Sequence, residues 1–257
     1  MELFWLLVLA HLGADFLLQT AQIAADKRTG RRQGYIKHAA GHFLSLVFFT
    51  HYYISPAMIL LWVVLPAAHT LIDWLKNRLN PPGHPAGAPV FLLDQALHFL
   101  IIFCVWQWTA TAPCEWIINF YSNLLSPAGS ELCGTLFKDT ALPTLLITAA
   151  IYGYVLLGGS VLVRKVLDLE TLRLPDQQRN YDNTRLAGRY IGLLERALIL
   201  TLTLAGAFTA IAFVFTAKSI ARYRELENRD FAEYYLVGTL LSTLLAFSGG
   251  LLLRFIR

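Results

Sequence analysis

The sequence predicts an all-α membrane protein, a bundle of about seven transmembrane helices, and three observations support this. Hydrophobic residues make up 56% of the 257 residues and charged residues only 15%, whereas soluble domains average about 25% charged. The apolar residues gather into long runs, and Lys and Arg concentrate between some of those runs. These features exclude a soluble globular domain, and the high hydrophobicity excludes intrinsic disorder.

Seven runs are long and apolar enough to cross about 30 Å of hydrocarbon at about 1.5 Å per residue. They cover residues 2–20, 38–54, 57–75, 91–110, 140–163, 190–216 and 234–253. We do not expect the first run to be a cleaved signal peptide, because no basic residue precedes it and it carries His11 and Asp15.

The runs divide the chain into three parts. We predict a four-helix membrane domain (1–110), an extracytoplasmic connection (111–139) and a three-helix membrane domain (140–257). The last part includes a cytoplasmic segment, residues 164–189.

Basic residues orient this bundle. The connection after the first run carries five of them, the connection after the third carries Lys76 and Arg78, and segment 164–189 carries six. The positive-inside rule predicts that these connections lie on the cytoplasmic side of a bacterial inner membrane, with the N-terminus outside and the C-terminus inside. Topology thus explains most of the net charge of +4, and we expect no nucleic-acid binding.

Residues 217–233 disagree with this orientation, since they fall outside the membrane yet carry four basic residues. Their basic and acidic residues alternate, which favours a salt-bridged helix at the membrane interface.

Two of the three cysteines, Cys114 and Cys133, lie in the predicted extracytoplasmic connection. In an oxidising periplasm they could form a disulfide, and two free thiols are the alternative. Cys104 lies within a predicted span.

The first four runs contain ionisable side chains, which are costly in a bilayer and point to function by default. Four pairs are spaced four residues apart, so that both members share one face of a helix. These pairs are His11/Asp15, His38/His42, His69/Asp73 and Asp94/His98. Because the helices alternate in direction, all four pairs lie within about 14 Å of the cytoplasmic boundary.

Imidazole and carboxylate groups on facing helices are how helical bundles hold metals, and this donor set suits Zn, Mn or Fe. The expected metal ligands are His11, Asp15, His42, His69, Asp73, Asp94 and His98. Asp15, Asp73 and Asp94 are also the catalytic candidates, and Gln19, His38 and Gln95 are expected to support the ligands. The alternative is that these groups only form hydrogen bonds between helices. His51 and His84 are expected at boundaries or in loops.

The later runs carry few ionisable residues apart from Glu195 and Arg196. Arg196 either neutralises Glu195 or faces a negatively charged ligand. Lys76, at the cytoplasmic end of the third run, is the other candidate for anion binding.

Several strings carry a family resemblance: HLGADFLLQT, HAAGHF, HTLIDWLK and LLDQALHFLI, and later GRYIGLLERALILTL and AKSIARYRELENRDFAEYYLVGTLLS. They resemble a bacterial membrane family, domain of unknown function 3307. This resemblance implies membrane localisation and no particular activity. A more distant similarity to small membrane-bound metal-dependent hydrolases favours a metal and names no substrate.

Three functions follow as hypotheses. The leading one is a metal-dependent membrane hydrolase, in which a divalent metal activates a water and a free carboxylate takes the proton. Nearby basic residues favour an anionic or phosphate-bearing, lipid-like small molecule as its substrate; they are Lys27, Arg28, Arg31, Arg32 and Lys76.

The second hypothesis is a transporter for a metal ion or a proton-coupled solute, although transporters place their sites near the midplane on interrupted helices. The third is a lipid-sensing or signalling module, whose partners would dock on segment 164–189. The number of subunits, including a homo-oligomer, stays open.

Overall fold

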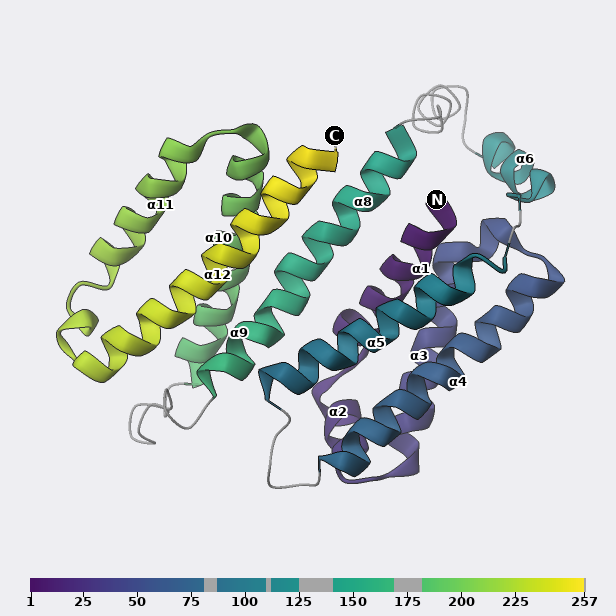
Figure 1. Cartoon of the computed structure of the whole chain (residues 1–257), viewed down its shortest axis with the longest axis horizontal. Coiled ribbons are helices and arrows are strands. Elements are labelled where there is room, and N and C mark those ends of the chain that lie inside the picture. Colours follow the sequence, from purple (N-terminus) through teal and green to yellow (C-terminus); the bar gives the residue numbers. More distant parts are fainter. Residues whose placement is uncertain (81–86, 110–111, 125–140, 169–181, 257) are drawn as a thin grey trace. The chain divides into compact units, whose positions relative to one another are not determined.

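The computed structural model describes residues 1–80, 87–109, 112–124, 141–168 and 182–256, and every regular element in these ranges is a helix (Figure 1). The all-α prediction is confirmed. The chain forms two compact units, residues 1–150 and 151–257. The division falls within α8 (Ala141–Gly153), close to the start of the domain that the sequence placed at residue 140.

The first unit opens with a bent segment. α1 (Glu2–Leu12) continues into a π-helical segment, η1 (Gly13–Leu18), and the chain then turns by 91° into α2 (Ala21–Arg28). The Thr20 side chain caps α2 by accepting a hydrogen bond from the Ile23 amide at 3.3 Å. Residues expected to form a loop therefore form a short helix, and α2 packs against α3.

Three long helices complete the part of this unit that carries the polar pairs: α3 (Arg32–Thr50), α4 (Pro56–Leu79) and α5 (Ala88–Trp106). A short 3-10 turn, η2 (His51–Tyr53), follows α3, and α6 (Glu115–Leu124) lies further along the chain. α3 packs against α1 and α4, and α5 packs against the same two helices. The four predicted pair-bearing segments are thus neighbours.

An apolar core holds these helices together. Leu7, Val8 and Met58 are completely buried, and Leu46 is nearly so. The indole of Trp62 on α4 donates a hydrogen bond to the Thr50 hydroxyl of α3 at 2.8 Å, which ties the two helices together beside that core.

The second unit begins in the last residues of α8, which continues through a second π segment, η3 (Tyr154–Gly158), into α9 (Gly159–Leu167). The remaining elements are α10 (Asp182–Ala205), α11 (Phe208–Ala221), the 3-10 turn η6 (Glu225–Glu227) and α12 (Arg229–Ile256). α10 and α12 pack against one another, and α12 also packs against α9.

The prediction of one continuous span over 190–216 is wrong. Gly206, with φ +75°, ends α10 in a conformation that residues with a Cβ rarely adopt, and α11 folds back along α10 (Figure 1). Lys218 of α11 consequently lies 2.5 Å from Glu195, in the middle of α10.

The expected interfacial helix over 217–233 is also not observed. The segment contains the end of α11, the turn η6 and the first residues of α12. Arg229 and Glu233, 3.0 Å apart, form the type of exposed pair that the alternating charges suggested.

By length and composition, four of the described helices could cross a membrane: α4, α5, the continuous helix Leu142–Leu167, and α12. The bent pair of α1–η1 and α2 makes a fifth if it is one span. The sequence suggested about seven; α3 does not pass this test, the sixth predicted span is divided at Gly206, and α11 is short.

Candidate metal centre

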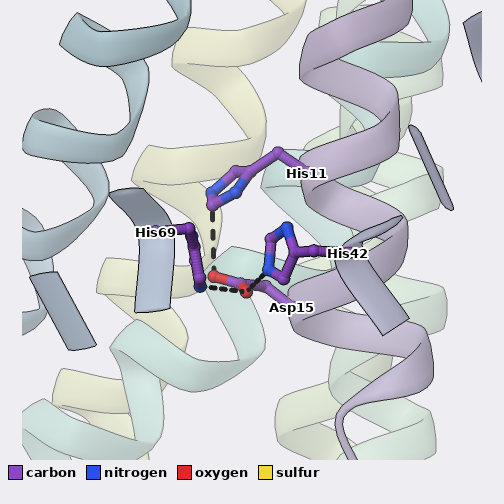
Figure 2. Close-up of side chains that lie close together, drawn as sticks. All are labelled: His11, Asp15, His42 and His69. Atoms are coloured by element: carbon purple, nitrogen blue, oxygen red, sulfur yellow. Dashed lines mark hydrogen bonds and ion pairs between the residues drawn. The ribbon is translucent and has the colours of Figure 1, made fainter. Parts of the chain in front are cut away.

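A carboxylate on the π segment lies at the centre of a cluster of histidines. Oδ1 of Asp15 is 2.9 Å from Nε2 of His42, 3.2 Å from Nε2 of His38 and 3.3 Å from Nε2 of His69. Oδ2 is 3.6 Å from Nε2 of His11. Figure 2 shows the side chains of His11, His42 and His69 pointing at this carboxylate.

Local structure explains this convergence. The first helix contributes His11 and Asp15, four residues apart, and the change to π-helical geometry occurs between them, at Gly13. π segments shift the following side chains around the helix and occur often at functional sites. Gly13 also packs closely on α3, since a Cβ there would lie 3.0 Å from Oγ of Ser45.

Burial shows that this is an interior cluster. Five of the chain's seven histidines are buried in it: His11, His38, His42, His69 and His98. His38, which the sequence assigned to the support of the ligands, is only 2% exposed and its Nε2 lies 2.9 Å from that of His69.

A second carboxylate, Asp73 of α4, adjoins the same histidines. Its Oδ2 lies 3.4 Å from Nε2 of His38 and 3.6 Å from Nε2 of His69. Both oxygens are also engaged by ammonium groups, because Lys27 contacts Oδ2 and Nζ of Lys76 is 2.5 Å from Oδ1. Asp73 is therefore the counterion of two lysines in this structure.

The predicted residues of α5 lie at the edge of the cluster. Oδ1 of Asp94 is 3.0 Å from Nζ of Lys76, and Gln95 donates a hydrogen bond to Asp15 at 3.4 Å. The ring of His98 stacks on that of His69 with 3.9 Å between centroids. Neither ring nitrogen of His98 has a hydrogen-bond partner among the described residues.

A small cavity adjoins these rings. It has a volume of about 20 Å³, enough for about one water molecule. Four histidines line it, His11, His42, His69 and His98, together with five aliphatic side chains. The cluster thus adjoins a small space lined by both imidazole and aliphatic groups.

Sequence reasoning missed the position of Lys27. It appeared as one of several basic residues near the membrane surface, yet it is 5% exposed and contacts Gln19 and Asp73. Its neighbour Arg28 is exposed. No signal in the sequence separates the two, because the face of α2 that packs against the other helices decides which of them is buried.

Three overlapping sets of side chains place their ligand atoms within 4.8 Å of one another. The sets are His11, Asp15, His42 and His69; His38, His69 and Asp73; and Asp73, Asp94 and His98. The second and third sets depend on Asp73, whose two oxygens already meet lysines. Within the described residues, no lysine forms an ion pair with the first set, which makes it the best suited of the three to a cation.

Arg196, the other predicted anion-binding residue, lies in the second unit. Its guanidinium donates to the Leu156 carbonyl at 3.1 Å and to Ser242 at 3.3 Å, and it also contacts Ser160. The adjacent Glu195 pairs with Lys218 instead. These contacts join α10 to its neighbours, so the expected direct Glu195–Arg196 neutralisation is not what the structure shows.

Several residues named from the sequence lie outside the described residues or away from the cluster. Cys133 and His84 lie outside the described residues, as do residues 169–181 of the predicted cytoplasmic segment. The pairing of Cys114 with Cys133 therefore stays a prediction. His51 lies away from the cluster, with Nε2 3.1 Å from the Tyr121 hydroxyl.

Comparisons with known proteins identify a domain and no activity. No curated protein and no solved structure matches the chain. Residues 3–125 match the model of a family described as protein of unknown function (DUF3307), and this range contains every residue of the cluster. Residues 3–125 are therefore similar to the DUF3307 family.

Proposed function

We propose that this protein is a membrane-embedded, metal-dependent hydrolase that acts on an anionic or phosphate-bearing, lipid-like substrate. One observation carries the proposal: three imidazole Nε2 atoms, from His38, His42 and His69, lie 2.9–3.3 Å from a single carboxylate oxygen of Asp15. A bare carboxylate does not require so many nitrogens, whereas a divalent cation does.

Hydrogen bonding alone explains the cluster less well. A neutral imidazole carries one N–H, so only one of His38 and His69 can donate in the 2.9 Å contact between their Nε2 atoms. The two nitrogens of His98 are buried without a hydrogen-bond partner among the described residues. Unpaired buried polar atoms are costly, and a bound cation with its water would satisfy such groups.

The proposed ligands are Asp15, His42 and His69, completed by His11 or His38. This donor set suits Zn, Mn or Fe. A divalent metal at this position supplies a water activated for attack at neutral pH. Asp94, beside Lys76 and close to His98, is the carboxylate proposed to take up the proton. Asp73 is the counterion of Lys27 and Lys76.

We propose that the protein lies in the bacterial inner membrane. We infer the orientation of each unit from the end that carries its basic residues. In the first unit, one end carries Lys27, Arg28 and Lys76. We propose that this end faces the cytoplasm, which leaves the N-terminus outside. In the second unit, α9 ends and α12 begins at one end, since Leu167 lies against Gly238.

That end of the second unit also carries the basic residues of the turn between α11 and α12, and we propose that it is cytoplasmic. α12 then leads the C-terminus outside, contrary to the expectation from a continuous span over 190–216. We propose that the hairpin accounts for the basic residues of 217–233, because it would return them to the same side of the membrane as the end of α9.

Elemental analysis of the purified protein tests the metal centre. We expect about one divalent metal ion per chain, and its loss in Asp15→Asn and His69→Gln, because a site with four or five donors binds weakly when one is removed. His51→Gln is the matched control: it removes a histidine outside the cluster and should retain the metal. Size-exclusion chromatography and helical circular dichroism verify folding. A parent protein without metal, or a fully loaded His69→Gln variant, would contradict the proposal.

A second assay tests the reaction. The metal-loaded protein in lipid vesicles is expected to release a water-soluble product from an anionic phospholipid, and the Asp15→Asn variant is expected to release none. Uptake of metal or solute into sealed proteoliposomes without any product would instead identify a transporter.

A further inference from the structure

We infer that the proposed metal centre binds a monoanionic oxyanion group, such as a phosphodiester or a carboxylate, and that Lys27 and Lys76 hold it beside the metal. This inference rests on the proposed function and narrows its substrate class. The charge of the cluster, the donors left on the two lysines and the burial of those lysines each support it.

The charge of the cluster is the first argument. Among the described residues, it contains three carboxylates, Asp15, Asp73 and Asp94, and two ammonium groups, Lys27 and Lys76. Histidines that ligate a metal are neutral. With one divalent ion bound and its histidine ligands neutral, the cluster therefore carries a net charge of +1.

A buried net charge is unfavourable unless it is paired. A single negative charge neutralises the metal-loaded cluster, whereas a neutral molecule leaves it at +1 and a dianion at −1. The binding preference should therefore favour monoanions.

Lys27 and Lys76 have hydrogen-bond donors available for a ligand. An ammonium group has three N–H donors. Lys27 uses its contacts to Gln19 and Asp73, and Lys76 uses its contacts to Asp73 and Asp94. Within the described residues, each lysine thus retains one N–H that could donate to an oxyanion.

The burial of these lysines distinguishes them from residues that only set topology. The side chains of Lys27 and Lys76 are 6% and 24% exposed, whereas that of Arg31 on the same segment is 72% exposed. The end of α2 is also fixed in place, because Tyr35 donates to the Lys27 carbonyl at 3.0 Å and accepts from Asn77 at 3.0 Å. A topogenic charge requires neither burial nor such positioning.

The experiment uses the full chain loaded with Co²⁺, whose visible absorption reports ligand changes at the metal. Dimethyl phosphate, a monoanion, is the probe, and trimethyl phosphate is its neutral counterpart. We expect saturable spectral changes with dimethyl phosphate and none with trimethyl phosphate. Because this comparison uses the unmodified sequence, it remains decisive where a variant fails to fold.

Lysine variants locate the anion. Lys27→Met and Lys76→Met should each weaken dimethyl phosphate binding about tenfold or more, the effect of losing one hydrogen bond to a charged group. Lys27→Arg and Lys76→Arg keep the charge and should bind within about threefold of the parent, since charge matching dominates. Arg28→Met is the matched control, because it removes the adjacent exposed charge and should change nothing.

The outcomes separate the two proposals. A protein that takes up no Co²⁺ contradicts the metal centre itself. If the Co²⁺-loaded protein does not bind dimethyl phosphate, or binds trimethyl phosphate equally well, the result contradicts only the monoanion inference. Unchanged affinity in folded Lys27→Met and Lys76→Met variants would likewise overturn the assignment of the anion to these lysines.

Discussion

Asp73 connects the polar cluster to the lysines at the residue scale. Its carboxylate contacts Lys27 from α2 and Lys76 from its own helix, and it adjoins His38 and His69. A buried ion pair adds little net stability by itself, but the removal of one partner leaves the other charge uncompensated. Asp73 is therefore a residue where a small change should have a large structural effect.

Asp73→Asn is expected to lower the free energy of unfolding by about 3–5 kcal/mol, because it removes the carboxylate paired with the buried Lys27 and one of the two carboxylates paired with Lys76. Unfolding of the detergent-solubilised protein measures this effect. Glu233→Gln is the control, since it breaks an exposed pair with Arg229 and should cost at most about 1 kcal/mol. Equal effects of the two substitutions would show that the lysines do not depend on Asp73.

Sequence spacing predicted which residues meet but not how they pair. The four-residue spacing and alternating helix direction placed His11, Asp15, His42 and His69 at one level, and the structure brings them together. The engagement of Asp73 by two lysines could not be predicted, because it depends on the bend that carries Lys27 inward.

At the scale of elements, Gly249 and Gly250 of α12 set how closely this helix approaches η3 and α10. A Cβ at Gly250 would lie 2.6 Å from Cβ of Thr203, and one at Gly249 would lie 2.7 Å from Cγ2 of Val155. Small residues allow helix backbones to approach closely where no water drives association. Helix amphipathicity does not reveal this contact, since both glycines lie in a long apolar run.

Gly250→Ala is expected to destabilise the protein by about 1–3 kcal/mol, because the added methyl group overlaps Thr203 and forces α10 and α12 apart. Thermal unfolding in detergent should show a lower midpoint. Gly188→Ala on α10 is the matched control: nothing lies within 4 Å of its Cβ position, and Ala favours a helix over Gly by about 1 kcal/mol. A Gly250→Ala midpoint equal to that of Gly188→Ala would argue against close packing at this site.

At the scale of the whole molecule, the α10–α11 hairpin changes the topology of the second unit. The guanidinium of Arg254, near the end of α12, lies over the ring of Phe208, and Gly206 adjoins the same arginine. Since α12 rises about 1.5 Å per residue, the hairpin tip lies about 37 Å from the start of α12. The tip and the C-terminus therefore share one end of the unit, and the turn after α11 lies at the other.

Cysteine labelling tests this topology. In a cysteine-free background, a cysteine appended to the C-terminus should react with a membrane-impermeant maleimide on intact cells, because we place that end outside. Arg224→Cys, in the exposed turn between α11 and α12, should react only after the cells are opened. The reverse pattern would restore the orientation expected for a continuous span and contradict the proposed topology.

The sequence alone determined the all-helical class, most helix positions in the first unit and the set of side chains that form its polar cluster. It could do so because apolar run length and four-residue spacing act along a single helix. Tertiary structure decided the bend before α2, the hairpin at Gly206 and the pairing of Asp73 with two lysines. These features depend on which surfaces of separate helices meet. The residue pattern within one helix does not reveal which helices pack against it.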